Sequence, residues 1–370
     1  LQPVDLIGKA QLDLLINDPA NELKLNASIP HIVYDGNTIK TISLECHSLR
    51  QGLDLLAGAT LYDNANNAVT ANIVTRAAND KLDLGALWNS NPTGKFEGTF
   101  HTQATFAIDD NDGSLTTFIQ ADSTCTTLNN SKWELDPFRL EIGPEHILID
   151  GLHFANDTTQ HLSADGVIAR HDTDTLQVSF QNLDLGYLLT MVKLEGISFD
   201  GAVSGHAEIA NLYTEQPHVE ATIEAQDFEF CEGLLGDVDG HIHWNQEASQ
   251  LQFTADVWES PHHTTVVDGR VDFAQDELWI DIAADSTNVS FLNNLLKSFM
   301  NDVKGHAYGN LTVGGPLDAL NLSGALLTDV DFNLTPTDVR YHFRDSLRFT
   351  PDVIHFNNIE AFDQRNQKAI

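Results

Sequence analysis

Apolar residues recur at every second position along most of this chain, and short turn segments interrupt the pattern at regular intervals. Over 219–225, Val, Ala and Ile alternate with Glu and Thr. Successive side chains of a β-strand point to opposite faces, so this period of two predicts strands with one apolar face. The phase flips at Phe228 and Phe230, which predicts a bulge near 226–227. The spacing implies on the order of 25 antiparallel strands.

Asp-Gly dipeptides recur between the alternating segments, and they are a strong signal for tight hairpin turns. We therefore expect turns at six places: Asp35-Gly36, Asp112-Gly113, Asp165-Gly166, Asp200-Gly201, Asp239-Gly240 and Asp268-Gly269.

Helix signals are few, and they recur at regular distances. Leu-Asp-Leu-Gly-Ala-Leu at 82–87 is echoed by Leu-Asp-Leu-Gly-Tyr-Leu at 183–188 and, more weakly, by Thr-Asn-Val-Ser-Phe-Leu at 287–292. Each copy is expected to open a short amphipathic helix, the best formed at 289–301 behind Ser290 as a cap. A unit of about 100 residues, with repeat boundaries near 82, 183 and 287, therefore runs through one elongated structure over 1–370.

Such a repeat has a consequence for the fold. Each alternating strand has only one apolar face to bury, and the next repeat unit extends the same sheet. One short helix per unit is too little to cover a wide apolar sheet. The sequence thus predicts an all-β fold with few short helices, an elongated curved antiparallel sheet that forms a trough with a hydrophobic interior. Strand counts leave a closed barrel and an open trough as alternatives.

The charge balance excludes several function classes. The chain of 370 residues carries 19 Lys and Arg against 54 Asp and Glu, a formal net charge of −35. A nucleic-acid partner is excluded because phosphate neutralisation needs clustered basic residues. Docking on an anionic lipid surface is disfavoured by repulsion. The three cysteines, Cys46, Cys125 and Cys231, have no metal or redox spacing, and we expect buried free thiols.

The C-terminal stretch carries a family resemblance. Val-Arg-Tyr-His-Phe-Arg-Asp-Ser-Leu-Arg-Phe-Thr-Pro at 339–351, with Asp-Gln-Arg-Asn at 363–366, resembles the C-terminal domain of the TamB family, the translocation and assembly module proteins within the wider AsmA-like group. The phrase at 309–317 and the Leu-Asp-Leu-Gly segments are similar to that group's repeats, in the form found in Bacteroides-like bacteria. The resemblance is strongest over 287–370 and rests on soft repeat motifs.

The resemblance implies a periplasmic protein of the cell envelope, anchored in the inner membrane by an N-terminal helix outside this stretch. Because the chain opens at Leu1 without Met and its longest apolar runs fall short of the ~20 residues that span a bilayer, we expect a soluble piece of a longer protein. The group is associated with phospholipid movement between the two membranes. It is also associated with outer-membrane protein assembly and protein secretion beside a partner barrel.

No catalytic, cofactor or metal constellation stands out, and we expect no enzyme activity. The Asp109–Gly113 loop places its glycine fifth, where an EF-hand needs it sixth, so a hairpin turn is favoured over a calcium site. His241 and His243 lie on one face of a strand, and this face is expected to meet water. Ser204 lacks the flanking glycines of a nucleophile elbow.

The sequence leaves two main functions open. The first is a lipid conduit, in which acyl chains of phospholipid or another cargo slide along the apolar trough. Its candidate lining residues are Phe228, Phe230, Ile242, Trp244, Leu251, Phe253, Leu278, Ile280 and Ile282. The second is a scaffold whose sheet edges pair with strands of an outer-membrane client. A carbohydrate-binding solenoid ranks last because clustered aromatics are missing.

The same alternation predicts where the charge lies. Glu220, Glu224, Asp256 and Asp281 alternate with apolar neighbours, so their carboxylates are expected on the face opposite the lining residues. An acidic outer face would keep an edge-bearing sheet soluble.

Overall fold

A computed structural model describes most of the chain. The described residues are 5–17, 22–34, 37–49, 52–62, 68–90, 95–128, 130–156, 159–169, 174–186, 198–211, 217–230, 232–260, 262–295, 297–316, 319–351, 353–356, 360–365 and 367–369. They form 27 strands and the short helix α2 (Leu292–Leu295), and residues 185–186 are also helical. The all-β prediction is confirmed. All strand pairings within the described residues are antiparallel, and the chain divides into two compact units, Leu1–Leu176 and Gln177–Ile370.

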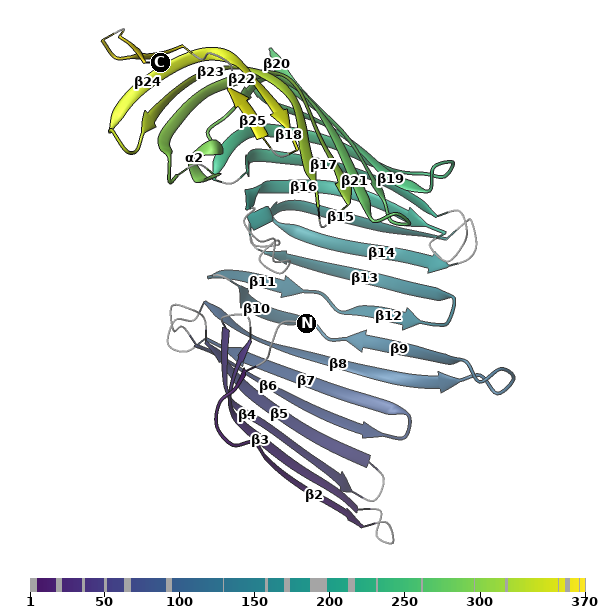
Figure 1. The fold of residues 1–370 in the computed structure, drawn as a ribbon. Coiled ribbons are helices and arrows are strands. Elements are labelled where there is room, and N and C mark those ends of the chain that lie inside the picture. Colours follow the sequence, from purple (N-terminus) through teal and green to yellow (C-terminus); the bar gives the residue numbers. More distant parts are fainter. Residues whose placement is uncertain are drawn as a thin grey trace. The chain divides into compact units, whose positions relative to one another are not determined.

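The N-terminal unit is a layer of strands that mostly follow one another in chain order (Figure 1). Its strands are β1 (Asp5–Leu6), β2 (Gln11–Asn17), β3 (Glu22–Tyr34), β4 (Asn37–Leu49), β5 (Gly52–Tyr62), β6 (Ala68–Ala78), β7 (Lys81–Asn89), β8 (Phe96–Ile108), β9 (Leu115–Ala121), β10 (Thr124–Leu128), β11 (Ser131–Leu135), β12 (Phe138–Ile142), β13 (His146–Asn156) and β14 (His161–Ala169). The long strand β8 pairs with β9 along one half and with β10 along the other, and β13 pairs likewise with β12 and β11.

The division between the units falls within β15 (Thr175–Asp184). The C-terminal unit continues with β16 (Phe199–Ala210), β17 (His218–Phe230), β18 (Gly233–Asn245), β19 (Gln250–Ser260), β20 (His263–Asp272), β21 (Glu277–Asn288), α2, β22 (Met300–Pro316), β23 (Asn321–Leu334), β24 (Val339–Thr350), β25 (Val353–Phe356), β26 (Ala361–Asp363) and β27 (Lys368–Ala369). From β16 to β24 each strand pairs with the next one along the chain.

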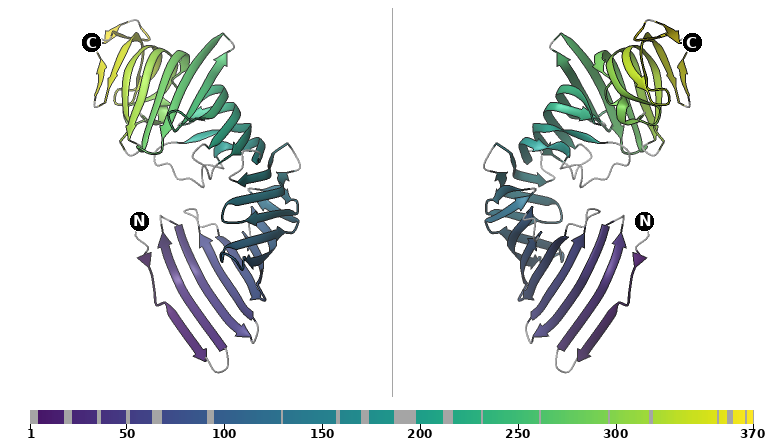
Figure 2. Two further views of the ribbon diagram at one scale, coloured as in Figure 1. Left: turned by 90° about the vertical axis from the view of Figure 1, so that its right-hand side faces the viewer. Right: turned by 90° about the vertical axis from the view of Figure 1, so that its left-hand side faces the viewer.

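Within each unit the strands lie side by side in a single curved layer (Figures 1 and 2). In the C-terminal unit, β22–β24 bend around α2. The most buried cluster lies here and contains Val289, Val303, Ala307, Val330, Phe343 and Leu347. Elsewhere some apolar side chains, such as Leu176 and Val203, are buried, but many keep part of their surface exposed, because no second layer of the described strands covers them.

The predicted bulge at 226–227 is confirmed. The pairing of β17 with β18 skips between Ala225 and Phe228, and Asp227 adopts a positive φ of 50°. The extra residue of the bulge shifts the alternation of side chains by one position, so Phe228 and Phe230 point to the same face of the sheet as Ala225. Comparable breaks occur in β4, where Thr41 has a φ of 54°, and in β22, where Asp302 has a φ of 50°.

Two sets of sequence predictions are wrong. Leu82–Leu87 lies inside strand β7 and is not helical, and the helix expected over 289–301 is limited to α2. The helix expected to open at the second copy, 183–188, falls almost wholly outside the described residues, of which 185–186 are helical. Of the six Asp-Gly dipeptides, Asp112-Gly113 forms a turn as predicted and Asp35-Gly36 lies outside the described residues. The other four, at 165–166, 200–201, 239–240 and 268–269, lie within strands. The repeat of about 100 residues stays a prediction.

Candidate functional site: an apolar strand face opposite an acidic one

Registered strands align apolar residues into rows that run across the C-terminal unit. Row A contains Ala207, Ala221, Ile242, Phe253, Gly269, Ile280, Val313 and Leu322, each paired with the next. Row B contains Gly205, Ile223, Gly240, Ala255, Val267, Ile282, Leu311, Gly324 and Phe349. Row C contains Trp244, Leu251, Val271, Leu278 and Gly315. The three rows share one face, which we call the apolar face.

Seven of the nine predicted lining residues fall in these rows. Ile242, Phe253 and Ile280 belong to row A, Ile282 to row B, and Trp244, Leu251 and Leu278 to row C. All nine, including Phe228 and Phe230, are only partly buried. A filled core would remove such side chains from water, so their partial exposure marks an open apolar surface.

Phe228 and Phe230 occupy the same face at the other end of their strand. Phe230 packs on Phe291, with 5.7 Å between the ring centroids. Gly233, which pairs with Phe230, lies against the Phe291 backbone so closely that an added Cβ would come within 2.1 Å of its nitrogen. The structure therefore separates these two phenylalanines from the rows and places Phe230 beside the segment that carries α2.

The N-terminal unit has apolar rows of the same kind. One contains Leu53, Ala77, Leu82, Ala104, Ile119, Leu140, Ile149 and Gly166, and another contains Ala27, Leu44, Ala57, Ile73, Ala86 and Phe100. Sequence reasoning did not single these residues out. The signal that could have found them is the same period of two, which runs through Leu82, Leu84, Ala86 and Trp88.

The opposite face of the C-terminal unit carries the charge. Glu220, Glu224, Asp256 and Asp281 are all exposed on that side, which confirms their predicted orientation. Histidines interleave with these carboxylates. Pairs between histidine nitrogen and carboxylate oxygen include His241–Glu220 at 3.1 Å, His263–Asp285 at 3.2 Å and His306–Glu259 at 3.4 Å.

His241 and His243 share this face, as predicted from the sequence. Their rings stack with centroids 5.7 Å apart, and the Nε2 of His243 lies 3.1 Å from the Gln252 Oε1. Within the described ranges, no group of three or more His, Cys, Asp or Glu side chains is arranged to hold a metal ion. The Asp109–Gly113 loop is a hairpin turn in which the Gly113 amide donates to the Asp109 carbonyl.

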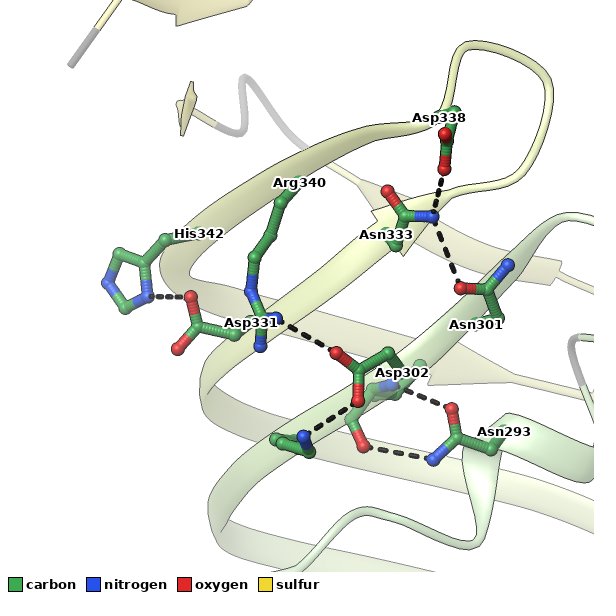
Figure 3. A network of polar contacts seen from close by, with 10 residues as sticks. Asn293, Asn301, Asp302, Asp331, Asn333, Asp338, Arg340 and His342 are labelled. Atoms are coloured by element: carbon green, nitrogen blue, oxygen red, sulfur yellow. Dashed lines mark hydrogen bonds and ion pairs between the residues drawn. The ribbon is translucent and has the colours of Figure 1, made fainter. Parts of the chain in front are cut away.

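Near α2, polar side chains of β22, β23 and β24 form a small network of hydrogen bonds and ion pairs (Figure 3). The Arg340 Nη1 donates to the Asp302 Oδ2 at 2.8 Å, and Lys304 donates to the other oxygen at 2.7 Å. The Lys304 hydrogen bond, with the positive charges of Lys304 and Arg340, lowers the pKa of the Asp302 carboxyl.

The cysteine prediction holds only in part. Cys46 is buried and free, whereas Cys125 is exposed, and Cys231 lies outside the described residues. Side chains alternate between the two faces of a strand. The neighbours Thr124 and Thr126 lie on the more buried face of β10, so Cys125 lies on its exposed face.

No family model matches this sequence. No curated protein matches it either. In the described part of the chain, no helix is both long enough and apolar enough to cross a bilayer. The resemblance to the TamB family therefore remains an expectation from motifs, and function has to be argued from the two faces of the sheet.

Proposed function

We propose that the protein is a periplasmic lipid conduit of the TamB/AsmA-like type, which conducts phospholipid between the inner and outer membranes along its apolar face. The observation that carries this proposal is the set of unbroken apolar rows across β16–β24, whose side chains remain partly exposed. Glycine, alanine and branched or aromatic side chains fill rows A and B without a charged residue.

The dimensions of row A suit acyl chains. Its eight strands, about 4.8 Å apart, give a length of about 34 Å. One leaflet of a bilayer's hydrocarbon core is about 15 Å thick, so this row is long enough for two chains end to end. Each buried CH₂ contributes about 0.8 kcal/mol, and half-burial of ten such groups would still contribute about 4 kcal/mol.

The acidic face has a place in the same proposal. Carboxylates and histidines there stay hydrated and repel anionic bilayer surfaces, so the sheet would not lie flat on a membrane by that face. Lipid would then be taken up only along the apolar side, with its headgroup at the hydrated rim.

The test places a carboxylate in row A, through Ile280→Asp and, separately, Phe253→Asp. Ala283→Asp is the matched control, because Ala283 lies on β21 as Ile280 does but is exposed on the opposite face. We expect all three variants to keep their fold, because a carboxylate on an open surface can hydrate and costs a few kcal/mol or less. Lipid that co-purifies, measured by mass spectrometry, should be lost from the two row variants and kept in the control.

Other outcomes separate the remaining functions. Unfolding of Ile280→Asp and Phe253→Asp, but not of Ala283→Asp, would indicate a packed core in place of a groove. Folded row variants with unchanged lipid would contradict the conduit and leave the scaffold ahead.

One observation favours that scaffold as the second candidate. Strand β2 pairs with β3 on one side, and its other edge has no partner among the described strands. All seven of its side chains are exposed, including Leu12, Leu14 and Ile16. An open apolar edge of this kind can accept an added strand from a client protein.

A further inference from the structure

The connection between β21 and β22 is longer than a hairpin needs and lies on the apolar face. We call the described residues of this connection, 289–295 and 297–299, which include α2, the lid. Phe291 and Leu292 of the lid pack against the cluster formed by Val303, Val330 and Phe343. The sequence predicted an amphipathic helix over 289–301 for this segment, longer than α2.

The lid divides the apolar face into two parts of different exposure. Under it, Val303 is 1% exposed, Ala307 2% and Val330 4%. Away from it, the row residues Phe253 and Ile280 remain partly exposed. Both parts belong to one face of the same strands, since Ala307 and Val313 of β22 point to the same side. The covered part is therefore a continuation of rows A and B that the chain's own side chains occupy.

A polar latch holds the lid down. The Val303 amide donates to the Asn293 Oδ1 at 2.6 Å, and the Asn293 Nδ2 donates to the Val303 carbonyl at 3.0 Å (Figure 3). These Val303 groups are free of the ladder with β23, because the pairing skips from Asn301 to Lys304 at the Asp302 bulge. The side chain of Asn293 thus takes the position that a neighbouring strand would take.

The two ends of the lid are also held by backbone hydrogen bonds: the Val289 amide donates to the Gly305 carbonyl at 3.1 Å, and the Thr335 amide donates to the Phe299 carbonyl at 3.0 Å. Between these ends, the side-chain contacts of the lid other than Asn293 and Phe291 are weaker. The Asn294 Nδ2 donates to the Glu232 Oε1 at 3.3 Å, near the upper limit of a hydrogen bond. Phe299 is 55% exposed. The helix has only four residues, too few to be stable without the packing and the latch.

We propose that the apolar face of β22–β24 is a second acyl-chain-binding surface, which the lid occupies in place of cargo, and that Asn293 is the latch that keeps it closed. This inference rests on the proposed conduit function and adds its regulation. Phe291 and Leu292 stand where methylene groups would lie, and opening the lid would join the covered surface to the rows. An acyl chain is the fitting occupant because the covered surface is continuous with rows A and B.

The test replaces Phe253 or Phe343 by the photoreactive residue benzoylphenylalanine. The protein is mixed with phospholipid vesicles and illuminated, and lipid crosslinked to each position is measured. Each position is studied in the parent protein, in Asn293→Ala and in the matched control Asn294→Ala, which keeps the latch. We expect lipid to crosslink at position 253 in all three backgrounds. At position 343 it should crosslink on the order of tenfold more in Asn293→Ala than in the other two, since both neutral hydrogen bonds between Asn293 and Val303 are lost.

The outcomes separate the lid from the conduit. Crosslinking at 253 with equal, low crosslinking at 343 in every background would overturn the lid. Absence of lipid at 253 in all backgrounds would instead overturn the conduit. If circular dichroism shows that Asn293→Ala is unfolded, Asn293→Asp serves in its place, because it keeps the acceptor for the Val303 amide and loses only the donor. Unchanged crosslinking at 343 in that variant would likewise contradict the latch.

Discussion

At the scale of single residues, His101 on β8 shows how carboxylates of neighbouring strands are joined in the N-terminal unit. Its Nδ1 lies 2.6 Å from the Asp122 Oδ2, and its Nε2 lies 3.0 Å from the Asp83 Oδ1. The hydrogen bond with Asp122, followed by the one with Asp83, raises the pKa of His101 above its usual 6.5. One imidazole thus joins a carboxylate of β7 to that of Asp122, the residue that follows β9.

This arrangement makes part of the stability depend on pH. Because the folded-state pKa is raised, the stabilisation is fully present below pH 6.5 and is lost as the pH rises through the raised value. We expect His101→Gln to lower the free energy of unfolding at pH 5.5 by about 1 kcal/mol or less, since the pair is exposed. At pH 9 the loss should be near zero, as measured by thermal unfolding.

Gln103→Ala is the control for that measurement. The Gln103 Nε2 also donates to Asp83, at 3.2 Å, but the amide does not titrate. Its effect should be the same at both pH values. A His101→Gln loss that is equal at pH 5.5 and pH 9 would show that the imidazole acts by packing and not by charge.

Among the lining residues, the period of two was enough to predict which side chains share a face. Ile242, Phe253 and Ile280 come from three strands, yet their alternation alone assigned them correctly to one side. The neighbour of Phe230 could not be predicted in this way. Phe291 is far along the chain, and its position depends on how β18–β22 curve, which no local pattern encodes.

At the scale of elements, strand pairing determined the secondary structure more than local sequence patterns did. Leu82-Asp83-Leu84-Gly85 was expected to begin a helix, but its leucines also alternate with a period of two. Strands β6 and β8 supply hydrogen-bonding partners on both sides, and this outweighs a weak helical preference. Short apolar segments are ambiguous until their neighbours are known.

One of the Asp-Gly dipeptides inside strands, Asp268-Gly269, has a cross-strand explanation. Gly269 pairs with Phe253, and a Cβ added there would come within 2.0 Å of the Phe253 ring. The ring lies over the backbone of the glycine, as does Trp88 over Gly98 and Trp279 over Gly314. Glycine here makes room for an aromatic side chain from the next strand, a cross-strand requirement that turn statistics do not contain.

This gives a matched pair of substitutions. Gly269→Ala should lower the free energy of unfolding by about 1–3 kcal/mol, because the Phe253 ring must leave its position. Gly240→Ala should be neutral or slightly stabilising, since an added Cβ lies 3.6 Å from its nearest atom, the Ile223 carbonyl oxygen. Thermal unfolding of both variants checks the difference. Equal losses would mean that the ring does not depend on the glycine.

At the scale of the whole molecule, a net charge of −35 opposes the compact state by self-repulsion. Ions at 0.15 M screen exposed charges beyond about 8 Å, whereas at 0.01 M the screening length is about 30 Å. We therefore expect the melting temperature to rise by roughly 2 °C or more between 10 and 150 mM NaCl. At pH 4.5, where protonated histidines and partly protonated carboxylates bring the net charge toward zero, the rise should be much smaller. An equal rise at both pH values would contradict self-repulsion as the cause.

The order of strands in the C-terminal unit has a consequence for how the chain reaches its native state. Between β16 and β24 each strand pairs with the next one in sequence, so these pairings close only short loops. Low sequence separation between contacts favours fast folding, and no strand has to wait for a distant partner. A chain that arrives end first, as during synthesis or export, can add one strand after another to a growing edge. Each added strand then becomes the template for the next, and the exposed edge moves along the chain until the last strand joins.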